Sequence, residues 1–226
     1  MKYIDKADSN LGWKVKQHLI AKGLETPMVD DNTLSDDQKI EKIKPLVADI
    51  MNVLGLDLSD DSLNETPKRV AKMYVKDLFW GLDYEKFPKC TTVENKMSAP
   101  DEFVLVKDIT LHSVCEHHLV TIDGFVSVAY VPNDKVLGIS KLARVASFFA
   151  ARPSVQERTT HQICEALKFI LGTDDVCVYM NAVHYCMKAR GIQDSSASTV
   201  TMAASGKFAG PNSTLRGEFL RNITSK

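Results

Sequence analysis

Long apolar segments are missing from this sequence of 226 residues. Its first residues, MKYIDKADSNLGWKVKQHLIAKG, contain no continuous apolar stretch, and no run of 18 apolar residues occurs later. A membrane-spanning helix needs about 20 mostly apolar residues, and a signal peptide needs a shorter apolar core. We therefore expect no membrane span, no signal peptide and a cytoplasmic location.

An excess of one charge is also missing. The chain has 28 basic and 29 acidic residues, which gives a net charge of -1. Such a chain has no overall attraction for nucleic acid or for an anionic membrane, so we expect neither as a partner. Any phosphate binding must come from a local cluster of basic residues.

Cysteine is too scarce and too scattered for a disulfide framework, because the five cysteines are an odd number spread over a long chain. Cys164 lies in a helical pattern and Cys177 in a strand pattern, so we expect both in the core. Cys90 carries no clear signal. Cys115 and Cys186 remain as candidate metal ligands.

The hydrophobic periodicity changes near residue 90. Before it the pattern is helical: Ser35 and Gln38 form a capping box, Gly55 ends the helix, and Thr66 caps the next helix before Pro67. After it we expect two helices, one from Ser140 and one over 154–171, a terminal helix over 215–223, and strands over 103–111, 124–131, 176–187 and 198–204. We predict an α+β chain with an antiparallel sheet and two helices on one face, divided into a helical region 1–90 and a second domain 91–226 that contains the sheet.

Two histidine- and cysteine-containing motifs follow or end strands. The first is Cys115-Glu116-His117-His118, and the second is His184-Tyr185-Cys186. Since strand side chains alternate, we expect His184 and Cys186 on one face. Thiolates with imidazole suit zinc. Core packing and surface histidines are the simpler alternatives, and the spacing allows either a closed four-ligand structural site or an open three-ligand catalytic site.

A candidate anion site lies in residues 138–144 (GISKLAR), which we read as a loop entering a helix with Ser140 as N-cap. Lys141 and Arg144 share one side of the first turn. Basic residues are unfavourable at a helix N-terminus, which suggests that they bind an anion there. A solvated basic face is the alternative. Arg190, with Lys188, would share the face of Cys186 if the strand continued.

The next helix start contains Ser154-Val155-Gln156-Glu157, which fits a capping box with Glu157 as the third helical residue. The alternative is that the carboxylate of Glu157 accepts two N–H groups from a ligand. The sequence pattern favours the capping role.

Together these motifs resemble the GTP cyclohydrolase I family over about residues 35–223. The matching stretches are ETPKR (65–69), SVCEHH (113–118), GISKLAR (138–144), RPSVQER (152–158), HYCMKARG (184–191) and RGEFL (216–220). The resemblance implies a tunnelling fold with an N-terminal helical extension. It also implies a homo-oligomer, a decamer of two pentamers, in which the sheets close into barrels.

The resemblance further implies the chemistry of the site. It implies that GTP is the substrate and that zinc is the cofactor, bound by Cys115, His118 and Cys186. The catalytic residues that it implies are His117, His184 and Ser140. Guanine would be bound by Gln156 and Glu157, and the triphosphate by Ser140, Lys141, Arg144 and Arg190, with Arg69 as a further contributor. The implied reaction opens the guanine ring at C8, releases formate and yields 7,8-dihydroneopterin triphosphate, without nicotinamide or flavin.

Two kinds of competing function remain at this stage. Pyruvoyl-tetrahydropterin synthase relatives bind zinc through three histidines, and nitrile-reductase relatives lack the Cys-Glu-His-His motif, so both fit less well. A binding protein with a closed structural zinc site is the alternative outside enzymes.

Overall fold

The structure is a computed structural model that describes residues 7–29, 33–96 and 102–225. The chain forms two compact units, one of residues 27–80 and the other of the preceding segment together with the residues from 81 onward. This division differs from the expected boundary near residue 90. The reason is helix α1 (Ser9–Ala21), whose Val15 and Leu19 are completely buried and whose His18 contacts Glu165 in the second unit.

The unit of residues 27–80 contains α2 (Asp36–Val53), α3 (Thr66–Lys72) and the π-helical segment η2 (Met73–Leu78). The predicted capping box is confirmed, because Ser35 Oγ accepts from the Gln38 backbone N–H and the Gln38 side chain accepts from the Ser35 N–H. Gly55, with a φ of 79°, lies just beyond the end of α2, where a left-handed residue commonly terminates a helix.

One predicted cap in this unit is wrong. Glu65 occupies the N-cap position of α3, so Thr66 is already the first helical residue and Pro67 the second. Proline is tolerated throughout the first turn because the N–H groups there have no helical partner. The small core of the unit consists of Ile40, Ala71 and Val75, with Ile43 packed against it.

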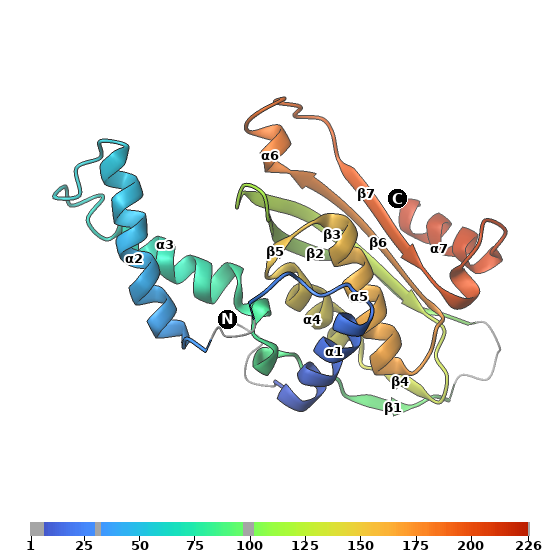
Figure 1. Ribbon diagram of the computed structural model, residues 1–226. Coiled ribbons are helices and arrows are strands. Elements are labelled where there is room, and N and C mark those ends of the chain that lie inside the picture. The colour runs from blue at the N-terminus through green and yellow to red at the C-terminus, as the bar shows by residue number, and fades with distance from the viewer. Residues whose placement is uncertain (1–6, 30–32, 97–101, 226) are drawn as a thin grey trace. The chain divides into compact units, whose positions relative to one another are not determined.

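A five-stranded sheet with the order β5-β2-β3-β6-β7 forms the centre of the other unit (Figure 1). Its strands are β2 (Val104–Cys115), β3 (Thr121–Tyr130), β5 (Pro153–Ser154), β6 (Val176–His184) and β7 (Thr199–Ala204). All pairs are antiparallel except the short β5, which runs parallel to the end of β2. The predicted antiparallel sheet is therefore confirmed.

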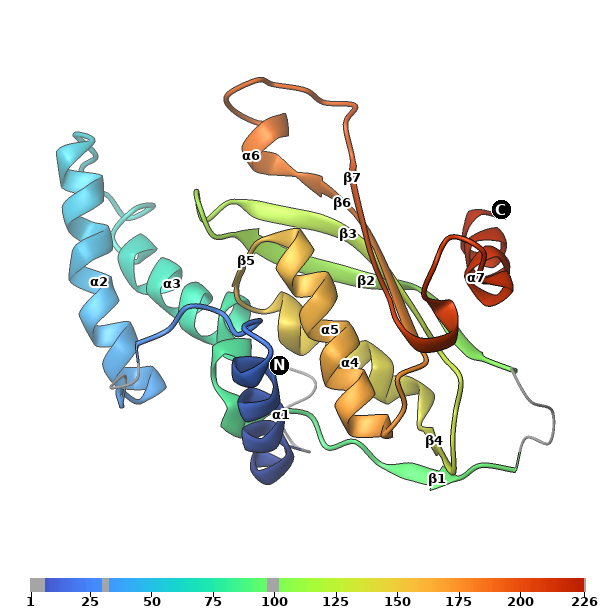
Figure 2. The same cartoon turned by 45° about the vertical axis from the view of Figure 1, so that its right-hand side comes forward.

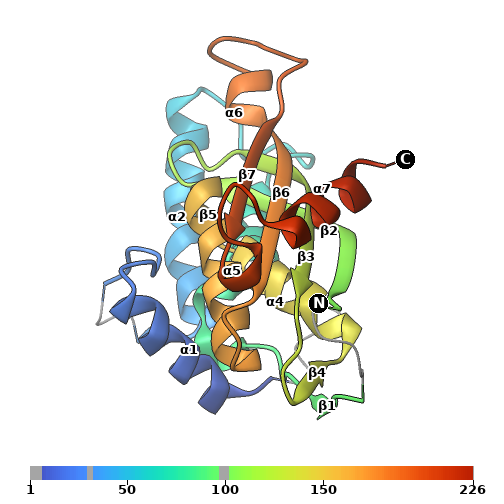
Figure 3. The ribbon, with the colours of Figure 1, turned by 90° about the vertical axis from the view of Figure 1, so that its right-hand side faces the viewer.

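Helices α4 (Ile139–Ala150) and α5 (Gln156–Leu171) cover one face of this sheet (Figure 2). Alternate residues of β3 and β6, among them Val128 and Val178, are completely buried under them. Helix α7 (Thr214–Thr224) lies on the opposite face (Figure 3). Its Phe219 packs there with Ala129 and Cys177. The predicted mixed α+β architecture is confirmed, and Cys164 and Cys177 are buried as expected.

Both predicted caps of α4 and α5 are wrong. Gly138 occupies the N-cap position of α4 and Val155 that of α5, and neither helix has a side-chain cap. Ser154 cannot cap α5 because it belongs to β5, and its Oγ lies 2.8 Å from Thr159 Oγ1. Consequently Glu157 takes no part in a capping box.

The remaining elements are short. They are the paired strands β1 (Thr92–Glu94) and β4 (Lys135–Leu137), the helical turn α6 (Tyr185–Lys188), and the 3₁₀ turns η3 (Trp80–Leu82), η4 (Tyr84–Lys86) and η5 (Gly206–Phe208). Within the described ranges, every helix is too short or too polar to cross a bilayer.

The completely buried side chain of Arg152 connects the segment that follows α1 with the start of β5. The guanidinium of Arg152 donates to the Gly81 carbonyl and lies 3.4 Å from Glu25 Oε1 and 3.5 Å from the Tyr84 hydroxyl. It also stacks near three aromatic rings. Burial raises the pKa of Tyr84 well above its usual value, so its hydroxyl stays protonated and donates a hydrogen bond to Glu25. This cation holds residues 25, 81 and 84 against the strand that leads into α5.

Candidate metal and active site

The first group of site residues lies in the tight turn that follows β2. The Cys115 N–H donates to Val120 O, and the Leu119 N–H donates back to Cys115 O, each at 2.8 Å. Leu119 closes the turn with a left-handed backbone, at a φ of 52°. Because the turn is a single closed loop, the side chains of Cys115 and His118 converge at the end of the sheet.

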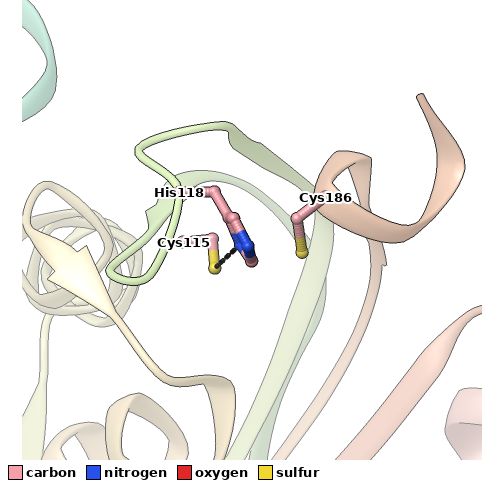
Figure 4. Close-up of side chains that lie close together, drawn as sticks. All are labelled: Cys115, His118 and Cys186. Atoms are coloured by element: carbon pink, nitrogen blue, oxygen red, sulfur yellow. Dashed lines mark hydrogen bonds between the residues drawn. The ribbon is translucent and has the colours of Figure 1, made fainter. Parts of the chain in front are cut away.

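Cys186, in helical turn α6, completes a three-residue cluster with Cys115 and His118 (Figure 4). One sulfur or nitrogen atom of each residue lies within 4.8 Å of the others, and Cys115 Sγ is 3.9 Å from His118 Nδ1. Tetrahedral zinc, with bonds of about 2.0–2.3 Å, holds its ligand atoms roughly 3.5–3.8 Å apart. The donor set and its spacing therefore fit zinc with only small side-chain movements.

The route by which Cys186 reaches this cluster differs from the prediction. Strand β6 ends at His184, and the chain turns into α6, so His184 and Cys186 do not share a face by strand alternation. For the same reason Lys188 and Arg190 do not continue that face. Lys188 instead lies over the Tyr185 ring at 5.5 Å, whereas exposed Arg190 is close enough for its charge to act on Cys186.

The thiol of Cys186 ionises less readily because it is partly buried beside Cys115. Burial, together with the neighbouring Cys115, raises the pKa of the Cys186 thiol above its usual value. Two adjacent thiols resist joint ionisation, since one thiolate repels the next. A metal ion would reverse this effect, because a coordinating thiol is deprotonated.

The two histidines outside the cluster have different surroundings. His117 is exposed, and its Nδ1 lies 3.8 Å from Cys115 Sγ. His184 is half-buried at the end of β6, where its Nε2 lies 2.7 Å from Gln156 Oε1. Burial lowers the pKa of His184, although the charge of nearby Glu157 opposes this. Both histidines therefore lie beside the cluster.

An ion pair that the sequence analysis missed braces the turn. Glu116 lies between the two motif ligands in sequence and pairs with Arg158 of α5. The Glu116 backbone N–H also donates to Ser154 O at 3.1 Å. The sequence shows a carboxylate, that of Glu116, inside the Cys-Glu-His-His motif. Only the fold shows that Arg158, which belongs to a different element, lies next to it.

The start of α5 brings Gln156 and Glu157 to the same end of the sheet. The Gln156 side chain is buried, whereas Glu157 is exposed and takes no part in helix capping. Because Glu157 does not cap the helix, the alternative interpretation remains: its carboxylate is available to a ligand.

The predicted phosphate-binding residues lie elsewhere in the same unit. Helix α4 starts beside β4, at the end of the sheet opposite to the Cys115 turn (Figures 1 and 2). Leu137, just before α4, donates its N–H to the Tyr130 hydroxyl, and Tyr130 pairs with Val104 at the start of β2. The 12 residues of β2 separate that end from Cys115, a distance of about 36 Å at 3.3 Å per residue.

Ser140, Lys141 and Arg144 therefore do not meet the metal cluster within one chain. Ser140 is exposed, and Lys141 and Arg144 are half-buried. The thiol of Cys90 lies near both cations, and its burial raises its pKa to about 12. Arg69 belongs to the unit of residues 27–80.

Comparison with known proteins identifies relatives over nearly the whole chain. GTP cyclohydrolase 1 of Aliivibrio salmonicida (strain LFI1238) is 54% identical over 209 residues, which cover 92% of this chain and 95% of the relative. GTP cyclohydrolase 1 of Vibrio cholerae serotype O1 has the same identity and coverage. Among solved structures, the apo form of the archaeosine synthase QueF-Like aligns with 48% of this chain and 97% of its own, with 22% identity and a TM-score of 0.40.

A family model described as GTP cyclohydrolase I matches residues 43–224. This range contains all the residues of the metal cluster and both helix starts described above. The chain belongs to the GTP cyclohydrolase I family.

Proposed function

We propose that this protein hydrolyses GTP at C8 of the guanine ring, releases formate and forms 7,8-dihydroneopterin triphosphate, the first step of pterin and tetrahydrofolate synthesis. The observation that carries the proposal is the Cys115–His118–Cys186 cluster in a chain that is 54% identical to GTP cyclohydrolase 1 over 209 residues. The cluster supplies the donors that a metal-assisted hydrolysis needs, and the relatives supply the substrate class.

The cofactor in this proposal is zinc, held by Cys115, His118 and Cys186. Zinc, when bound, supplies Lewis-acid activation of water for attack on C8. Three protein donors are typical of catalytic zinc, whereas structural sites use four. Among the described residues, the cluster joins Cys115, His118 and Cys186 without His184, which supports the open arrangement.

Proton transfer in this proposal belongs to His117 and His184. C8 of guanine is a poor electrophile, so attack on it requires a proton on N7. Histidine is suited to this role because it exchanges protons near neutral pH. The exposed His117 and the half-buried His184 flank the cluster from two different elements, which supports a role for each in successive proton transfers.

Base recognition in this proposal rests on Glu157. Its carboxylate can accept both the guanine N1–H and the 2-amino group. Adenine does not present these two donors together, so ATP would leave the carboxylate without partners, and such mismatches discriminate strongly. The exposure of Glu157 and the absence of a capping role support this assignment.

The triphosphate would be bound by Ser140, Lys141, Arg144 and Arg190, with a contribution from Arg69. A helix N-terminus with free N–H groups is a ready anion site, and two cations lie in the first turn and a half of α4. Since the start of α4 is remote from the metal cluster of the same chain, we propose that a neighbouring copy completes each site.

This assembly would be the decamer of two pentamers that the family resemblance implies, with sheets joined into barrels. The edge strands of the sheet could pair with strands of neighbouring chains. In the described part of the chain, β7 pairs on one side only, and β2 pairs on its outer side only through its last residues, Val114 and Cys115. Exposed sheet edges are commonly paired or covered in native proteins.

Incubation of the purified protein with GTP tests the proposed function. We expect the absorbance of a dihydropterin and one formate per GTP consumed, no reaction with ATP, and loss of activity after zinc is chelated. A closed structural zinc site in a binding protein would give stoichiometric zinc and no formate, and would overturn the proposal.

A further inference from the structure

The side chain of Gln156 is fully committed inside the protein. It is 1% exposed, and its Nε2 lies 2.9 Å from Thr199 O, 3.1 Å from Thr201 Oγ1 and 3.3 Å from Met180 O. Two of these partners are backbone carbonyls, which can only accept. The amide nitrogen must therefore face β6 and β7, and the amide oxygen must face the other way.

That oxygen faces His184. Gln156 Oε1 lies 2.7 Å from His184 Nε2, and an amide oxygen can only accept a hydrogen bond. Nε2 must therefore carry a hydrogen. In the neutral ring this leaves Nδ1 as the acceptor, so the surroundings of Gln156 set the tautomer of His184.

A hydroxyl network fixes Gln156 in turn. Thr160 Oγ1 donates to Gln156 O at 2.8 Å and lies 2.6 Å from Thr201 Oγ1, which itself contacts the Gln156 amide nitrogen. Residues of α5 and β7 therefore hold one glutamine in one orientation. An unsatisfied buried amide would be costly, so this orientation is strongly preferred.

We propose that Gln156 is a positioning residue, which holds His184 with Nε2 protonated and leaves Nδ1 as the nitrogen that exchanges a proton with the substrate. This inference rests on the proposed function, in which His184 takes part in proton transfer. It assigns different roles to two adjacent residues: Gln156 turns inward to His184, whereas Glu157 turns outward and is available to the guanine base.

Kinetics of Gln156→Met test the proposal. We expect kcat to fall by about 10- to 100-fold, a part of the roughly 10²- to 10⁴-fold that a positioned proton-transfer group contributes, with KM for GTP within about threefold. Gln162→Met is the matched control. Gln162 is equally buried on α5, but its amide donates to Leu24 O and Thr26 Oγ1, so its loss should leave kcat unchanged.

A double-mutant cycle separates this role from simple structural damage. If Gln156 acts through His184, adding Gln156→Met to His184→Ala should change the residual rate, measured with enzyme in excess over GTP, by no more than about twofold. The dissociation constant of GTP in that background should also stay within about threefold. The proposal would be overturned if the two substitutions lowered the rate independently, so that their effects multiplied. Tenfold weaker binding of GTP in the His184→Ala background would also overturn it.

Gln156→Glu provides a second variant if the methionine fails to fold. It keeps the shape and an oxygen acceptor beside Nε2, and a protonated carboxyl can also donate to a carbonyl of β6 or β7, so we expect a kcat above that of Gln156→Met. A folded Gln156→Glu protein that has lost kcat and binds GTP tenfold more weakly would instead show direct base binding. Failure of the proposed function is distinguishable, because wild-type protein would then release no formate.

Discussion

At the scale of single residues, the metal donors make the sharpest prediction. Cys115→Ala, His118→Ala and Cys186→Ala should each lose zinc and turnover, since two remaining donors hold the metal far more weakly than three. Zinc content per chain, measured by mass spectrometry after dialysis, tests this. His117→Ala is the control: it should keep zinc and lose activity. Full zinc occupancy in Cys186→Ala would refute the ligand assignment.

The carboxylate of Glu157 makes a second residue-scale prediction. Glu157→Gln replaces one of two acceptors by a donor, so GTP binding should weaken by about 1.5–3 kcal/mol, or roughly 10- to 150-fold in KM. The melting temperature should not change, because Glu157 caps nothing. Glu165→Gln is the contrast. It breaks the ion pair of Glu165 with Lys168 and alters its contact with His18, and should lower stability while KM stays unchanged.

At the residue scale, the sequence indicated the three side chains of the candidate metal cluster but not the contacts that hold them in place. The three donors are brought together as the family resemblance implied. The sequence could not predict the contacts Gln156–His184 and Glu116–Arg158, because each joins two elements whose packing no local pattern encodes. Gln156 illustrates this: the resemblance implied that it binds guanine, whereas its side chain is buried against β6 and β7.

At the scale of elements, the errors concern where helices begin and strands end. Ser140 and Ser154 looked like N-caps because each precedes an amphipathic run, but Gly138 and Val155 occupy those positions. Strand pairing of β5 with β2 uses Ser154 and decides the start of α5. Propensity is a weak guide wherever such tertiary contacts compete with it.

Removal of the buried guanidinium of Arg152 gives a testable prediction at the scale of elements. Arg152→Met removes the partner of Glu25 and the donor to Gly81, and should destabilise the protein by about 3–5 kcal/mol, as expected when one member of a buried ion pair is removed. Chemical denaturation measures this loss. Arg152→Met with Glu25→Gln should recover part of it, since no buried charge is then left alone.

Arg221→Met on α7 is the control for that series. Arg221 is exposed, and such surface substitutions change stability by about 0.5 kcal/mol or less. An Arg152→Met protein as stable as Arg221→Met would contradict the structural role assigned to the buried guanidinium.

At the scale of the whole molecule, the separation between α4 and the metal cluster determines what a single chain can do. The cluster and the start of α4 lie at opposite ends of a 12-residue strand, so side chains of one chain cannot bridge them. A nucleotide that uses both groups must therefore contact two chains. Sequence alone could not show this, because adjacency along the chain says nothing about which end of the sheet each motif occupies.

Mixing two inactive variants tests this arrangement. His117→Ala damages the cluster side and Arg144→Ala the α4 side, so co-refolded chains should form some sites in which both contributions are intact. With random association into a closed ring, roughly a quarter of the sites are intact, and we expect about that fraction of wild-type dihydropterin formation. His117→Ala mixed with Cys186→Ala is the matched control, because both changes damage the same side and no site is restored. No recovery in the first mixture, or a fully active monomer in sedimentation at the assay concentration, would show that one chain suffices.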